Sequence, residues 1–327
     1  MTFRINLKSS GRTFDSEGKE TILRAGMRDG LNLAHNCMNG SCGECAAHLI
    51  SGDVEQLRHH DYILSDQQKQ RGDFLTCCYR AASDLELELH ELHHVSEIPY
   101  QEIDVKVSKF ELLQEDIIQL HLRSSRSKVL EFFAGQNVQL CLPDGSCLSL
   151  GIASCPCDGM NLRFHLRINE QNISENLIKQ LKKGSKLKIK GPYGNLTLNE
   201  DSNRPVIFIA WESSFASIQS VIDHTISIDE DRKIALYWLS AIPNGHYLSN
   251  YCRSWRDILD NFCYESIDLQ PAGEDTLNST LERLVQQQGD LLDSDVYAVM
   301  PEAELILTRD FLIKLGLPED QFIEEVF

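Results

Sequence analysis

The sequence has little proline, no long apolar run and fewer cations than anions, and each shortage excludes a class of protein. Nine prolines among 327 residues, with 42% hydrophobic residues, exclude a proline-rich disordered or fibrous chain. The most apolar stretches, such as Val206 to Trp211, are far shorter than the roughly 20 residues that span a bilayer. The first residues alternate like a strand and lack the apolar centre of a signal peptide, so we expect a cytoplasmic protein without a membrane span.

The shortage of cations is concentrated at one end of the chain. The net charge is −18, and residues 201–327 contain 8 Lys and Arg against 23 Asp and Glu. A surface of this sign repels polyanions, so we expect no nucleic-acid partner. A solvated surface explains the charge most simply, and a docking surface for a basic partner is the alternative.

Eleven cysteines in a large chain without an export signal indicate thiolates that bind a metal rather than disulfides. Three of them have the spacing C-x4-C-x2-C and a fourth follows after a long gap: Cys37, Cys42, Cys45 and Cys77. This is the ligand pattern of a plant-type [2Fe–2S] cluster, which needs four thiolates for its two irons. Gly40 and Gly43 lie where the loop must bend around the cluster.

The first hundred residues resemble the plant-type ferredoxin family in two long motifs, Cys37 to Val54 and Phe74 to Glu88. The resemblance implies a ferredoxin β-grasp fold over residues 1–94. In that family the fourth ligand follows a Leu-x pair, which favours Cys77 over its neighbour Cys78. Three histidines follow the last expected strand, and we interpret them as solvated rather than as a metal site: His90, His93 and His94.

The middle third alternates in short segments separated by turn residues, which predicts a small antiparallel β-barrel over residues 95–200. A helix is expected from Ser174 to Lys182. Ala134-Gly135-Gln136 and Gly191-Pro192-Tyr193-Gly194 resemble the flavin domain of the ferredoxin–NADP reductase superfamily. The nearest kin would be fused reductases that carry a ferredoxin and serve oxygenases or deoxysugar dehydratases.

The flavin motifs of that superfamily are altered in this sequence. Its signature R-x-Y-S, in which Arg binds the pyrophosphate and Tyr stacks on the ring, reads Leu148-Ser149-Leu150-Gly151. Leucine cannot offer the guanidinium fork that suits a pyrophosphate. The second phosphate turn has lost its glycine but keeps Ser174 at a helix N-terminus. FAD binding is left open, and the candidate contacts are Arg167, Ser174, Gly151 and Ile152.

Strands and helices alternate over residues 201–327, which predicts a doubly wound parallel α/β sheet like the superfamily's nicotinamide domain. The superfamily's G-G-T-G loop reads Trp211-Glu212-Ser213-Ser214, and its Cys-Gly-Pro reads Val299-Met300-Pro301. The Arg expected after the second strand is missing at Ser240-Ala241. On these changes we do not expect NAD(P)H to bind.

Three cysteines remain without a role: Cys147, Cys155 and Cys157. Their spacing matches no closed metal site, and we expect ordinary reduced thiols.

Two functions compete on these observations. The first is a degenerate reductase that keeps the [2Fe–2S] cluster as a one-electron relay, redox sensor or docking subunit for a protein redox partner, with FAD and NAD(P)H binding reduced or lost. The alternative is an active NAD(P)H-dependent FAD/[2Fe–2S] reductase that supplies an oxygenase or similar acceptor. An inert structural protein is a weaker third, because the cysteine loop is intact. We favour the relay, since the cluster motif is complete while the nucleotide motifs are not.

Overall fold

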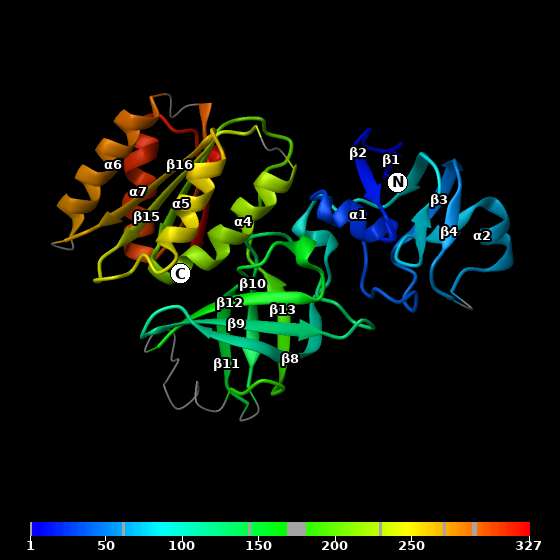
Figure 1. Ribbon diagram of the computed structural model, residues 1–327. Coiled ribbons are helices and arrows are strands. Elements are labelled where there is room, and N and C mark those ends of the chain that lie inside the picture. Colours follow the sequence, from blue (N-terminus) through cyan, green and yellow to red (C-terminus); the bar gives the residue numbers. More distant parts are fainter. Residues whose placement is uncertain are drawn as a thin grey trace.

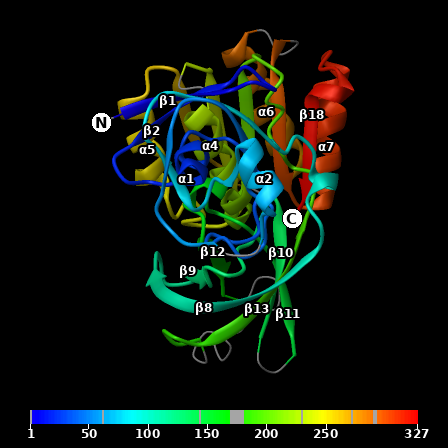
Figure 2. The same cartoon turned by 90° about the vertical axis from the view of Figure 1, so that its right-hand side faces the viewer.

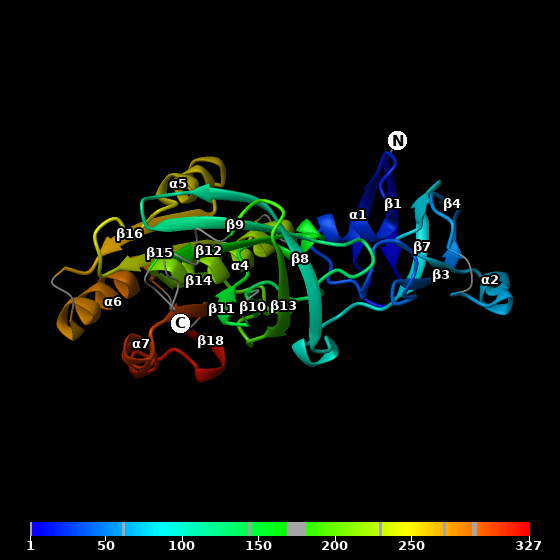
Figure 3. The same ribbon diagram turned by 90° about the horizontal axis from the view of Figure 1, so that it is seen from below.

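The structure, a computed structural model, describes residues 2–60, 63–142, 145–168, 181–228, 231–270, 273–289 and 293–327. Three sheets follow one another along the chain (Figure 1). We call the parts built on them the N-terminal unit, the barrel and the α/β unit. The N-terminal unit and the α/β unit lie on opposite sides, and both contact the barrel (Figures 1 and 3).

The N-terminal unit is a five-stranded mixed sheet in the order β2-β1-β7-β3-β5. Its strands are β1 (Thr2–Leu7), β2 (Thr13–Glu17), β3 (Ala46–Ser51), β5 (Asp73–Leu75) and β7 (Leu85–Leu89). A separate hairpin joins β4 (Val54–Gln56) to β6 (Tyr79–Ala81). The helices are α1 (Ile22–Arg28), shorter than the Glu20–Leu31 segment that periodicity indicated, and α2 (Asp66–Arg71). Alternating apolar residues of β1 and β7 pack onto α1, which gives the expected β-grasp core.

The barrel is a six-stranded antiparallel sheet in the order β11-β10-β13-β8-β9-β12. Its strands are β8 (Gln101–Leu112), β9 (Ile117–Ser124), β10 (Asn137–Cys141), β11 (Cys147–Gly151), β12 (Asn161–Arg167) and β13 (Lys186–Tyr193). Two short 3-10 turns, η1 (Val95–Glu97) and η2 (Pro156–Asp158), flank these strands. The helix expected from Ser174 lies almost wholly outside the described residues, because residues 169–180 are not among them.

The α/β unit is a five-stranded parallel sheet in the order β16-β15-β14-β17-β18. Its strands are β14 (Val206–Trp211), β15 (Ile234–Ser240), β16 (Phe262–Asp268), β17 (Asp295–Met300) and β18 (Phe322–Val326). Helices α4 (Phe215–Ile228) and α5 (Ser249–Ile258) pack on one face, and α6 (Glu274–Gln288) and α7 (Glu302–Lys314) on the other. Figure 2 shows α7 on the side opposite α4 and α5, which is the expected doubly wound arrangement. Short 3-10 turns precede α4 at η3 (Glu212–Ser214) and β18 at η5 (Glu319–Gln321).

One cysteine expectation is wrong. Cys147 is not a free thiol but forms a disulfide with Cys141. The two residues are direct partners in the antiparallel pairing of β10 with β11, which brings their Cα atoms to 4.1 Å. The spacing of six residues did not reveal this pairing, because only the hairpin register places the two side chains together. Cys155 and Cys157 are free, as expected.

Among the described residues, no helix is long and apolar enough to cross a membrane.

Candidate cofactor sites

The four predicted cysteines meet in one place at the edge of the N-terminal sheet. The Cys37 thiol is within hydrogen-bonding reach of the thiols of Cys42 and Cys77. Cys45 in turn reaches Cys77. The same contacts lower the pKa of Cys37 and raise the pKa of Cys42 and of Cys77, because neighbouring thiols share their protons.

The backbone around these sulfurs suits anionic thiolates. The Ser41 N–H donates to the Cys37 sulfur at 3.3 Å, and the Cys42 sulfur accepts from the backbone N–H of Glu44. Gly40 has a φ of +82°, and a Cβ there would lie 2.6 Å from the Cys78 sulfur. A side chain at position 40 would therefore both strain the loop and displace a sulfur. Four converging thiols with amide donors around them fit a [2Fe–2S] cluster.

Cys78 lies beside the four predicted ligands but is not one of them by the family's spacing. Its sulfur is 3.6 Å from that of Cys77, and both side chains are buried. Arg58 ties this segment to the cysteine loop, since its guanidinium donates to the Met38 carbonyl at 2.5 Å. The geometry alone thus leaves two neighbouring thiols available, and the family spacing favours Cys77.

A second site is a cleft of about 300 Å³ between the barrel and the α/β unit. The barrel contributes the ends of β10, β11, β12 and β13, and the α/β unit contributes η3, the start of α4 and the chain end. Its lining includes Asn137, Gly151, Arg167, Tyr193, Ser217 and Phe327. A cleft of this size, with aromatic walls and a few polar groups, is typical of a small-molecule site.

Arg167 is the charged group of this cleft. Its side chain is only 6% exposed, and Nη1 donates to Asp116 at 2.6 Å. Nε and Nη2 are buried and have no hydrogen-bond partner among the described residues. A buried guanidinium with two free donors is costly unless an anion binds it. Arg167 therefore fits the pyrophosphate of a flavin dinucleotide.

Of the other three predicted flavin contacts, one lines the cleft, one has its side chain in the barrel core and one lies outside the described residues. Gly151 lines the cleft. A Cβ at position 151 would lie 2.0 Å from the hydroxyl of Ser217 on α4. The serine that the family motif has at this position therefore does not fit here. Ile152 is fully buried among the apolar residues of the barrel core and does not line the cleft. Ser174 lies outside the described residues.

Sequence reasoning missed two aromatic residues of this cleft. Tyr193 follows the cis peptide bond between Gly191 and Pro192. The backbone N–H of Phe327 donates to the Met300 carbonyl at 2.9 Å, which fixes the position of the chain end. The Gly-Pro-Tyr-Gly motif was a visible signal for Tyr193. Phe327 had none, because only the fold returns the chain end to the barrel. His165 also lines the cleft as a neutral ring, since burial lowers its pKa to about 3.

In the altered loop after β14, a side chain of the loop itself occupies the space at the carboxyl ends of the strands. Glu212 is buried with a φ of +46°, where the family has glycine. Its carboxylate accepts the Ala241 N–H at 3.1 Å, so an anion of the protein already lies at the carboxyl ends of β14 and β15. The Trp238 indole also donates to the Glu212 carbonyl at 2.9 Å. Dinucleotide phosphates bind at this edge in doubly wound sheets.

A β-grasp unit with a four-thiol loop, joined to a barrel and a doubly wound sheet with a cleft between them, defines a multidomain redox protein of the ferredoxin reductase type. Residues 5–82 match the family model "2Fe-2S iron-sulfur cluster binding domain", and residues 104–198 match "Oxidoreductase FAD-binding domain". The chain therefore contains both domains.

Full-length relatives agree with these matches. The CDP-6-deoxy-L-threo-D-glycero-4-hexulose-3-dehydrase reductase of Yersinia pestis is 30% identical over 100% of this chain and 99% of its own. The reductase component 2 of terephthalate 1,2-dioxygenase from Comamonas is 27% identical over 100% and 98%. Among solved structures, the Amycolatopsis cytochrome P450 reductase GcoB has a TM-score of 0.62 at 20% identity over 99% and 98%, which shows the shared fold. The chain belongs to the family of fused ferredoxin and FAD-dependent reductases.

Proposed function

We propose that this protein is an FAD/[2Fe–2S] reductase that accepts electrons from a nicotinamide dinucleotide and delivers them singly to a separate protein partner. The observation that carries the proposal is Arg167, a buried guanidinium in the cleft between the barrel and the α/β unit, two of whose donors have no partner among the described residues. When bound, FAD takes up an electron pair as hydride from a nicotinamide, and the cluster carries one electron at a time. The partner would be an oxygenase or a sugar dehydrase, as the names of the relatives suggest.

Each part of the chain has a stated role in this proposal. Cys37, Cys42, Cys45 and Cys77 ligate the cluster. Arg167 binds the flavin pyrophosphate, Gly151 lets the ring approach the backbone of β11, and Tyr193 and Phe327 provide the aromatic walls. Residues 1–94, 95–200 and 201–327 form the ferredoxin, flavin and nicotinamide domains.

The test separates the two redox sites. NADH or NADPH should drive reduction of ferricyanide, a small acceptor that needs only the flavin, and of cytochrome c, which needs the cluster. Cys77→Ser should retain ferricyanide reduction and lose cytochrome c reduction. If the loaded wild-type protein reduces neither acceptor with either nucleotide, the proposal is wrong.

A second candidate is the one-electron relay without nicotinamide turnover, and Glu212 favours it. Its carboxylate accepts the Ala241 N–H where a dinucleotide phosphate would bind, and like charges repel. Glu212→Gly removes the carboxylate and suits the positive φ. If the relay is correct, NADH leaves the wild-type spectrum unchanged and bleaches that of Glu212→Gly. Equal bleaching in both proteins would reject the relay.

A further inference from the structure

The barrel has a row of like charges on its outer face. Lys186 of β13 is paired in register with Lys106 of β8, and Lys106 with Arg123 of β9. All three side chains are exposed. Like charges directly opposite each other on neighbouring strands destabilise a sheet. The row therefore needs an explanation other than folding.

The neighbouring rows of the same face are arranged normally. Lys188 stands opposite Asp104 and Lys190 opposite Glu102. Lys188 also forms an ion pair with Glu102 at 3.3 Å. Opposite charges alternate there, so the like-charged row is a local departure and not a property of the whole strand.

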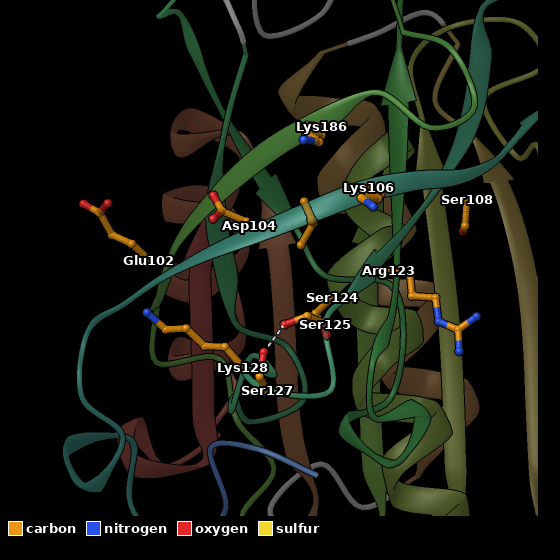
Figure 4. Close-up of a pocket in the computed structure, with 11 residues that line it drawn as sticks. Glu102, Asp104, Lys106, Ser108, Arg123, Ser124, Ser125, Ser127, Lys128 and Lys186 are labelled. Atoms are coloured by element: carbon orange, nitrogen blue, oxygen red, sulfur yellow. Dashed lines mark hydrogen bonds between the residues drawn. The ribbon is translucent and has the colours of Figure 1, made fainter. Parts of the chain in front are cut away.

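The row lines an open groove of about 850 Å³. Figure 4 shows Lys106, Lys186 and Arg123 around it, with Lys128 on the turn after β9. We call this hollow the basic groove. These four cations form no ion pair with any described residue, in a protein whose net charge is −18. The lining also contains Glu102 and Asp104, which stand opposite Lys190 and Lys188, so four cations face two carboxylates in the groove. A cleft in which one sign of charge predominates attracts the opposite charge.

The basic groove leads to the cysteine loop. The turn that carries Lys128 hydrogen-bonds both neighbours of Cys37, through Met38 N–H to Arg126 O at 2.9 Å and Val129 N–H to Asn36 O at 2.9 Å. Beyond the turn, Arg126 lines a narrow crevice together with Cys77. Arg24 and Arg58 line the same crevice, so positive charge continues from the barrel to the predicted cluster ligands.

We propose that the basic groove docks an acidic surface of the protein that accepts electrons from the cluster. This inference rests on the proposed function, because it assigns the partner's position. A protein surface fits better than a small anion, since the cations come from three strands and a turn around an open hollow. The α/β unit, with 23 acidic residues in positions 201–327, repels the same partner and so directs it to the barrel.

The test uses cytochrome b5, an acidic one-electron haem protein, as the probe. The protein is reduced with stoichiometric dithionite, which reduces any bound flavin as well as the cluster and leaves no excess to reduce cytochrome b5. Only the nicotinamide site is bypassed, and reoxidation of the cluster by oxidised cytochrome b5 is followed by stopped flow. The rate should fall steeply with ionic strength. Lys106→Ala/Lys186→Ala should lower the low-salt rate by about tenfold and flatten the salt dependence.

The matched control is Lys188→Ala/Lys190→Ala, which removes two cations from β13, the strand of Lys186, on the same face but outside the like-charged row. It should keep the wild-type rate within about twofold. The groove variant should unfold at the same or a higher temperature than the wild type, because it removes repulsion. A rate lost through misfolding would instead lower that temperature.

Binding without electron transfer keeps this inference separate from the proposed function. Zinc-substituted cytochrome b5 is titrated by fluorescence, which needs no cluster. Binding that weakens in the groove variant but not in the control supports the inference even if no cluster forms. Equal binding and equal rates in both variants would overturn it. So would displacement of cytochrome b5 by inorganic pyrophosphate at matched ionic strength, which would mark a small-anion site.

Discussion

Arg167 is almost completely buried, yet Asp116 is its only partner among the described residues. Under the proposed function, Nε and Nη2, which have no partner among the described residues, would bind the flavin pyrophosphate in place of the guanidinium that position 148 lacks. The replacement comes from β12 and not β11, so the motif at Leu148 to Gly151 could be altered without removing positive charge from the cleft.

Arg167→Ala should weaken FAD binding by tenfold or more, because a charge-assisted hydrogen bond is worth about 1.5–3 kcal/mol. Calorimetric titration of the flavin-free protein with FAD measures the change. Arg256→Ala removes an exposed arginine of α5 and should leave the affinity unchanged. Equal FAD affinity in Arg167→Ala and the wild type would show that Arg167 does not bind the pyrophosphate.

Cys77 and Cys78 provide a second residue-scale prediction. Cys77→Ser should abolish the [2Fe–2S] cluster, whereas Cys78→Ser should keep it with an altered spectrum, because the two sulfurs are 3.6 Å apart. Iron and inorganic sulfide analysis with visible circular dichroism reports both. Loss of the cluster in Cys78→Ser but not in Cys77→Ser would reverse the assignment.

At the scale of residues, the sequence predicted those features that depend on the spacing of neighbouring residues. The convergence of the four thiols was predictable because three of the four predicted ligands lie within nine residues of one loop. Tyr193 and Phe327 were not, because they meet only after the α/β unit has folded against the barrel. The side chain of Ile152, which was predicted from its place next to Gly151, packs in the barrel core, so a contact between Ile152 and a flavin stays a prediction.

At the scale of elements, the turn after β9 and the irregular segment that follows it hold the cysteine loop against the barrel. Glu131 lies in this interface, and its carboxylate accepts the His35 N–H at 2.6 Å. Burial raises the pKa of Glu131 from 4.5 to about 7. The folded protein therefore keeps a proton that the unfolded chain has released, and folding is favoured at the lower pH.

The stability of the wild type should therefore fall as the pH rises from about 4.5 to about 7, relative to Glu131→Gln. The difference should be on the order of 2 kcal/mol in the free energy of unfolding. Thermal unfolding of both proteins at pH 5 and pH 8 measures it, with the exposed Glu115→Gln as the control. A constant difference between Glu131→Gln and the wild type at the two pH values would contradict the prediction.

Periodicity predicted the elements well where one face is buried. Alternation gave the barrel strands, and the buried run Val206–Trp211 gave β14, but the bounds of α1 were wrong because helix ends depend on caps and packing. The disulfide Cys141–Cys147 was missed because it depends on hairpin register. The sequence predicted an acidic residue, Glu212, in the loop after β14. It did not predict that the Glu212 carboxylate accepts a hydrogen bond from the Ala241 N–H, because that contact depends on the fold.

At the scale of the whole molecule, Glu200 connects all three units. It follows β13, accepts Arg12 at 2.7 Å and Asn32 at 2.7 Å from the N-terminal unit, and contacts His224 of α4 at 2.9 Å. Burial opposes the ionisation of Glu200, but hydrogen bonds from His224 and Arg12 outweigh it and lower its pKa. One carboxylate thus fixes the cysteine-bearing unit relative to the cleft.

Glu200→Gln should loosen this junction, because charged hydrogen bonds become neutral ones. Backbone amide exchange in residues 28–33 and 224–228 should become about tenfold faster, as the loss of roughly 1.4 kcal/mol implies. Mass spectrometry after deuterium labelling measures it, and Glu282→Gln on exposed α6 is the control. Unchanged exchange in both segments would mean that Glu200 does not hold the units together.

The central claim is that nicotinamide, flavin and cluster work in one chain, and a visible spectrum of the anaerobically purified protein before and after NADH tests it most directly. The proposed reductase predicts flavin and cluster bands together, both bleached by NADH. Cluster bands without flavin, unchanged by NADH and by NADPH, would contradict it and favour the one-electron relay.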